Sequence, residues 1–84
     1  MAISVAVCVG DKVADEVVSK LANKVKSLRI GSGMEQGQEM GPVITQQQLD
    51  RITGLVAKGL EEGATLVVDG RDLIVEGNEQ GFFL

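Results

Sequence analysis

The sequence of 84 residues contains no histidine, tryptophan or tyrosine, and it has one cysteine, Cys8, and one proline. Without histidine, the chain lacks the side chain most often used for proton transfer near neutral pH and the commonest metal ligand. A single cysteine excludes an internal disulfide framework and a cysteine-cluster zinc site. Basic residues are also few, eight against twelve acidic ones, and the net charge of −4 disfavours nucleic acid as a partner. Little catalytic or metal-binding chemistry is left.

Long hydrophobic runs are absent as well. The apolar stretch Ala2–Val9 is too short to span a bilayer, and no basic leader precedes it. We therefore expect no membrane association and a cytoplasmic location, which the single cysteine also favours. The length corresponds to one small domain, residues 1–84, and 44% of the residues are hydrophobic, which is typical of a folded chain.

Hydrophobic patterning predicts a strand followed by a helix. The β-branched run Ala2–Val9 predicts a strand buried on both faces. Asp11–Arg29 has helical periodicity, with Asp11 as the expected N-cap and Gly31 as the stop. Its apolar stripe consists of Val13, Val17, Leu21, Val25 and Leu28. The lysines of this segment are interpreted as a solvated helix face.

A glycine-rich loop, 30–43, separates this helix from a second one. Thr45 and Gln48 have the spacing of a capping box, and Ile44 and Leu49 have that of a hydrophobic staple. The predicted helix ends at Gly63, and its buried stripe consists of Leu49, Ile52, Leu55, Val56 and Leu60. Its interior glycines, Gly54 and Gly59, predict close packing against another element.

The last third of the sequence predicts β-structure. Asp69-Gly70 between Ala64–Val68 and Arg71–Val75 is typical of a two-residue hairpin turn, and Gly81–Leu84 resembles the beginning of another strand. The expected fold is α/β: a small sheet with two packed helices, in the order β-α-α-β-β-β. Because an apolar strand is predicted at each end, the chain is expected to be cut from something longer.

No group of residues indicates an active site from its pattern alone. Cys8 late in a hydrophobic strand is interpreted as a core cysteine, because no histidine is available to activate it. The glycines of 31–37 follow a helix and miss the dinucleotide-binding spacing by one residue. The carboxylate pairs Glu61-Glu62 and Asp69/Asp72 are explained by a helix end and a turn. Gln48 is left open between a capping role and a functional one.

Several short motifs in order resemble the catalytic domain of aldehyde dehydrogenases. They are Leu28-Arg29-Ile30-x-Gly, Glu39-Met40-Gly41-Pro42-Val43-Ile44-Thr45, Glu62-Gly63-Ala64, Val68-Asp69-Gly70-Arg71 and Val75-x-Gly77-x-x-x-Gly81-Phe82. The resemblance covers essentially the whole chain and is nearest to the CoA-acylating methylmalonate-semialdehyde dehydrogenase branch.

This resemblance implies a larger NAD-dependent enzyme in which a cysteine attacks the aldehyde, hydride passes to NAD and coenzyme A takes up the acyl group. The family's cysteine would lie immediately before Met1, so no catalytic residue is carried over. Gln48 matches a position that approaches the cofactor ribose in some members. The chain is accordingly expected to be an inactive partial catalytic domain that binds no cofactor by itself.

Two functional hypotheses result. The first is a fragment of an NAD-dependent, CoA-acylating dehydrogenase that lacks the nucleophile and the NAD-binding domain. The second is a small non-enzymic α/β interaction module. In both, exposed sheet edges are expected to make the chain a homo-oligomer.

Overall fold

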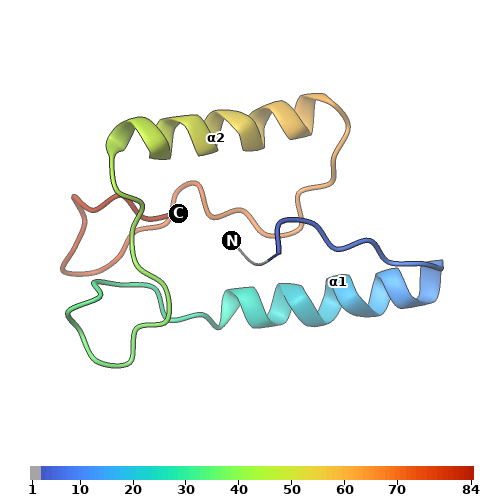
Figure 1. Ribbon diagram of the computed structural model, residues 1–84, viewed down its shortest axis with the longest axis horizontal. Coiled ribbons are helices and arrows are strands. Elements are labelled where there is room, and N and C mark those ends of the chain that lie inside the picture. Colours follow the sequence, from blue (N-terminus) through green and yellow to red (C-terminus); the bar gives the residue numbers. More distant parts are fainter. Residues whose placement is uncertain (1–2) are drawn as a thin grey trace.

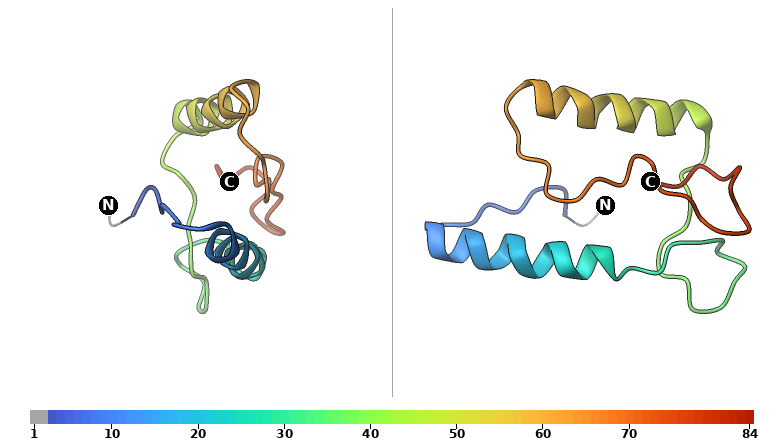
Figure 2. Two further views of the ribbon diagram at one scale, coloured as in Figure 1. Left: turned by 90° about the vertical axis from the view of Figure 1, so that its right-hand side faces the viewer. Right: turned by 180° about the vertical axis from the view of Figure 1, so that it is seen from behind.

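The computed structural model describes residues 3–84 and contains two helices, α1 (Asp11–Lys26) and α2 (Gln46–Glu61). They run in opposite directions on two sides of the molecule, and the coil after α2 passes between them (Figures 1 and 2). The helices make no direct contact with each other. Neither has the length and apolar character that crossing a membrane would require.

Helix α1 forms where the sequence predicts a helix, but it is shorter. It ends at Lys26, with Ser27 as the C-cap, instead of continuing to Arg29. The Ser27 hydroxyl donates to the carbonyl of Lys24 at 2.8 Å and closes the last turn. The predicted N-cap is wrong, because Asp11 is the first helical residue and Gly10 occupies the cap position without a side-chain hydrogen bond.

Helix α2 has well-formed ends. The Thr45 hydroxyl accepts a hydrogen bond from the Gln48 amide at 3.2 Å, which confirms the predicted N-cap. At the other end Gly63 adopts a φ of 99°, and its amide donates to Leu60 while that of Ala64 donates to Gly59. This pair of bonds is a Schellman motif, in which glycine accommodates the left-handed residue.

Hydrogen bonds connect the segment between the helices with the C-terminal coil. The segment 30–40 closes on itself through a parallel bridge between Ile30 and Met40. The Glu35 carboxylate in this loop accepts a hydrogen bond from the side-chain Nδ2 of Asn78 at 3.2 Å, across 43 positions of sequence. The Val43 amide donates to the carbonyl of Phe82 at 2.9 Å. These bonds hold the C-terminal coil against the segment between the helices.

The sheet and the packed helices expected from the sequence are not present. Within residues 3–84 the only β-pairing is the isolated Ile30–Met40 bridge, and no strand is formed. Residues 3–9 of the predicted first strand lack a partner, because no backbone hydrogen bond of their own is formed in the described part; Ala2 lies outside it. The prediction of an α/β fold in the order β-α-α-β-β-β was therefore wrong for this structure.

The predicted hairpin is replaced by a local turn. The Asp69 carboxylate accepts the amide of Arg71 at 3.1 Å, and the Leu73 amide donates to Gly70 at 3.3 Å. A side chain that binds a nearby backbone amide in this way competes with a strand ladder for the same donor. Segments 64–68 and 71–75 consequently remain coil, as does Gly81–Leu84.

The predicted buried stripes of both helices are also wrong in part. No residue of α1 or α2 is fully buried, and Leu55 is 61% exposed. The buried apolar side chain is instead Phe83, at 5% exposure. Its ring lies so close to Gly81 that a Cβ there would overlap it. The close packing expected at Gly54 is absent, since nothing lies within 4 Å of a Cβ built there.

Candidate functional site

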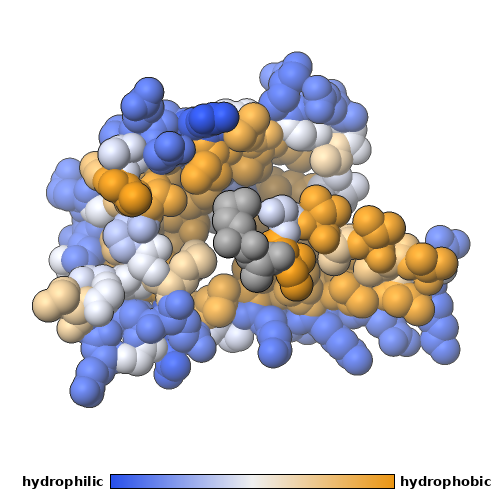
Figure 3. All heavy atoms as spheres, in the orientation of Figure 1, coloured by the Kyte–Doolittle hydropathy of each residue, from blue (hydrophilic) through white to orange (hydrophobic). Residues whose placement is uncertain are grey.

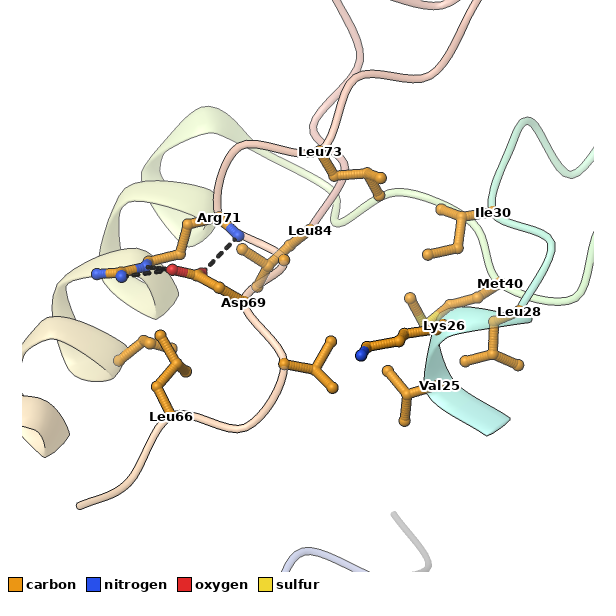
Figure 4. Close-up of a pocket in the computed structure, with 13 residues that line it drawn as sticks. Val25, Lys26, Leu28, Ile30, Met40, Leu66, Asp69, Arg71, Leu73 and Leu84 are labelled. Atoms are coloured by element: carbon orange, nitrogen blue, oxygen red, sulfur yellow. Dashed lines mark hydrogen bonds and ion pairs between the residues drawn. The ribbon is translucent and has the colours of Figure 1, made fainter. Parts of the chain in front are cut away.

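A hollow of about 390 Å³ lies between the end of α1, the middle of α2 and the coil that separates them. Figure 4 shows side chains from well-separated segments of the chain around it. Its lining consists of Val25, Lys26, Leu28, Ile30, Met40, Val56, Leu66, Val68, Asp69, Gly70, Arg71, Leu73 and Leu84. Most of these side chains are apolar, so the hollow could take an apolar group with one polar edge.

The polar edge is an ion pair between Asp69 and Arg71. The Arg71 guanidinium donates to both carboxylate oxygens, with Nη2 2.6 Å from Oδ2 and Nε 2.9 Å from Oδ1 (Figure 4). This side-chain hydrogen bond, together with the one from the Arg71 backbone amide, lowers the pKa of Asp69 to about 2. The same contact raises the pKa of Arg71. The Asp69 carboxylate thus engages the Nε and Nη2 donors of Arg71 in a bidentate pair.

Gln48, the sequence-predicted cofactor contact, lies in the first turn of α2. Its backbone amide binds Thr45, and the residue is exposed. It is not among the residues that line the hollow. The structure therefore shows the Thr45 N-cap half of the predicted capping box, whereas among residues 3–84 the Gln48 carboxamide makes no return hydrogen bond to the Thr45 amide.

Cys8 is half-buried, not part of a core as the sequence suggested. The coil around it contributes no ion pair or side-chain hydrogen bond to it among the contacts of residues 3–84. A nucleophilic thiol requires an adjacent base or a helix N-terminus that stabilises the thiolate. Cys8 precedes α1 by three residues without such a base, so the arrangement around it does not indicate a catalytic cysteine.

The lysines of α1 lie on the solvated helix face that the sequence predicted. Lys20 and Lys24 are exposed and share a shallow surface with Asn23 and Ser27, which confirms a solvated helix face.

Sequence reasoning missed the Asp69–Arg71 pair and the hollow. The pair could have been found from opposite charges two residues apart around a glycine. The hollow could not, because its lining comes from segments up to 59 positions apart, as Val25 and Leu84 are.

The chain belongs to the aldehyde dehydrogenase family, whose pattern it matches over residues 1–84. This confirms the family resemblance inferred from the sequence motifs. More specifically, the chain resembles the malonate- and methylmalonate-semialdehyde dehydrogenases. It is 52% identical over its whole length to malonate-semialdehyde dehydrogenase of Pseudomonas aeruginosa, and 42% identical to the acylating mitochondrial methylmalonate-semialdehyde dehydrogenase of Arabidopsis thaliana. It spans 17% and 14% of these two relatives.

Two solved structures of related proteins contain a segment with nearly the same conformation as this chain. A Sinorhizobium meliloti protein assigned as a methylmalonate-semialdehyde dehydrogenase and crystallised with NAD superposes with a TM-score of 0.93 at 49% identity. The methylmalonate-semialdehyde dehydrogenase of Oceanimonas doudoroffii gives 0.92 at 43% identity. In both cases 98% of this chain is covered and 17% of the other.

Proposed function

We propose that this chain is a segment of an NAD-dependent, CoA-acylating semialdehyde dehydrogenase, and that by itself it is inactive. The observation that supports this most strongly is the TM-score of 0.93 to an NAD-bound enzyme six times its length. The chain has the conformation of a segment of that longer protein. The nucleophile and the nucleotide-binding domain would be supplied by other parts of the longer enzyme.

We expect that the side chains of this chain do not hold NAD by themselves. Gln48 offers one neutral hydrogen bond from an exposed position, worth about 0.5–1.5 kcal/mol. Even millimolar affinity requires about 4.1 kcal/mol. Within the longer enzyme, we propose that the exposed Gln48 carboxamide contributes one contact to the cofactor ribose. Its place at the first turn of α2, with its backbone fixed by Thr45, would orient it for that contact.

A chimera tests this proposal directly. In it, residues 1–84 replace the matching segment of the Pseudomonas aeruginosa relative. We expect the chimera to form NADH and a CoA thioester from malonate or methylmalonate semialdehyde, and the isolated chain to form neither. Cys8→Ser is the matched control and should leave turnover of the chimera unchanged. A folded chimera without activity, or turnover by the isolated chain that Cys8→Ser abolishes, would contradict the proposal.

The exposed apolar surface favours a second candidate function, a non-enzymic module that self-associates. Ile3 and Val7 are 83% and 85% exposed, which leaves an apolar surface available for contact with another copy. Turnover of the chimera distinguishes the two candidate functions. Only the enzyme segment confers turnover there, whereas a self-associating module would assemble equally well without the rest of the enzyme.

A further inference from the structure

The coil at residues 78–83 is held in place by a turn and by burial. The Asn78 carbonyl accepts the amide of Gly81 at 2.9 Å, which closes the turn. Phe83 is 5% exposed, and its ring lies so close to Gly81 that it leaves no room for a side chain there. This segment, which we call the clamp, therefore keeps its place relative to the rest of the chain.

The clamp contacts the segment between the helices at two points. The side-chain Nδ2 of Asn78 donates to Oε1 of Glu35 at 3.2 Å. The Phe82 carbonyl accepts the amide of Val43 at 2.9 Å. In Figures 1 and 2 the red C-terminal coil meets the green segment that leads into α2. Because one short coil holds this segment at two points, it restricts both the position and the direction in which the segment enters α2.

Glu35 belongs to a closed loop, so its bond to the clamp acts on the whole loop. The second carboxylate oxygen of Glu35 accepts a hydrogen bond from Nε2 of Gln38 at 3.2 Å. The Gln38 carboxamide in turn lies where a Cβ of Gly31 would be, and the Gly31 amide donates to the carbonyl of Met40 at 3.1 Å. The contact at Asn78 is thereby connected to the residues that directly precede α2.

The first turn of α2 follows directly after the second contact. Thr45 caps the helix by accepting the Gln48 amide at 3.2 Å. Ile44, between Val43 and the cap, is 90% exposed, so its side chain does not anchor the start of the helix. The place of the Gln48 backbone is set by the Thr45 cap and, before it, by the bond between Val43 and Phe82.

We propose that Asn78 and Glu35 are positioning residues for cofactor binding. Their hydrogen bond sets the start of α2 and so directs the Gln48 carboxamide toward the ribose of NAD. This inference rests on the proposed function. In Figure 3 mainly hydrophilic and intermediate residues cover the loop side of the molecule, at the left, so the bond is made at a water-exposed surface. One such hydrogen bond changes an equilibrium constant by about two- to tenfold.

Titration of the chimera defined above with NAD tests the inference. Asn78→Ala and Glu35→Ala should each raise the Kd for NAD by about two- to tenfold, whereas kcat at saturating NAD stays unchanged. The double variant should raise the Kd no further, because both changes remove the same bond. Glu35→Gln keeps an oxygen that accepts the Asn78 side chain, so it should keep the Kd. Gln80→Ala is the matched control, since the Gln80 side chain is exposed and makes no hydrogen bond within residues 3–84.

A second cycle locates the effect at Gln48. In a chimera that carries Gln48→Ala, Asn78→Ala should leave the Kd for NAD unchanged. The same weakening with and without Gln48→Ala would overturn the positioning role while the enzyme assignment stands. Glu35→Gln that weakens NAD binding as much as Glu35→Ala would overturn it too. If Gln48→Ala alone does not raise the Kd, both the ribose contact of the proposed function and this inference are contradicted.

Discussion

Replacing Gly54 by alanine should have opposite effects in the isolated chain and in the longer enzyme. Glycine within a helix costs about 1 kcal/mol relative to alanine. In this structure a Cβ at Gly54 meets no atom within 4 Å, so the substitution adds no clash. Gly54→Ala should therefore stabilise α2 in the isolated chain by about 0.5–1 kcal/mol, which raises its helix–coil equilibrium constant by about two- to fivefold.

Circular dichroism at 222 nm and the carbon chemical shifts of residues 50–58 measure this gain. Gly59→Ala is the matched control, since its Cβ would make only an ordinary contact with Ala64 at 3.9 Å. It should raise helicity by a similar amount. In the chimera, where another element is expected to pack against Gly54, the same methyl group should lower the melting temperature. Unchanged helicity in the isolated chain, or equal stabilisation of chain and chimera, would refute this reasoning.

Three further predictions concern other parts of the chain. Thr45→Ala should destabilise α2 by about 0.5–1 kcal/mol and lower its helicity, because Ile44 is 90% exposed and no staple supports the cap. Thr45→Ser should retain the helicity, because serine keeps a hydroxyl that accepts the Gln48 amide, and equal helicity in both variants would contradict the cap. The pKa of Asp69 is lowered from 3.8 to about 2, so the stabilising effect of its pair with Arg71 is complete above about pH 4 and lost as the pH falls through 2. Carboxyl NMR titration should show this shift, and Arg71→Leu should return the pKa to its ordinary value; an unshifted Asp69 would contradict the pair. In the absence of other polypeptide, the exposed side chains of Ile3, Val5, Val7 and Val9 should drive self-association at high micromolar concentration, and a monomer by light scattering would contradict this.

The helices could be predicted from the sequence because their determinants are local. Periodic apolar residues and the Thr45 cap lie within the helices or next to them, and both helices form. The predicted ends were less accurate at α1, where Ser27 closes the helix before the glycine that was expected to stop it.

The predicted sheet was wrong, because strands depend on partners elsewhere in space that a local sequence pattern does not reveal. The β-branched run Ala2–Val9 predicted a strand buried on both faces, but residues 3–9 pair with no residue of the described chain, and Ile3, Val5, Val7 and Val9 are exposed. At the expected hairpin turn, Asp69 instead accepts the Arg71 amide, and no ladder is formed there. The candidate site shows the same division. Gln48 was found through a motif, whereas the hollow is formed by distant segments that no motif connects.

The rate of NADH formation by the chimera tests the central claim most directly. If this chain is a functional segment of a semialdehyde dehydrogenase, kcat/KM of the chimera should lie within about tenfold of that of the Pseudomonas aeruginosa relative, a loss of no more than about 1.4 kcal/mol in transition-state stabilisation. A chimera that folds and assembles like the relative but whose kcat/KM is lower by a factor of about a thousand or more would contradict it.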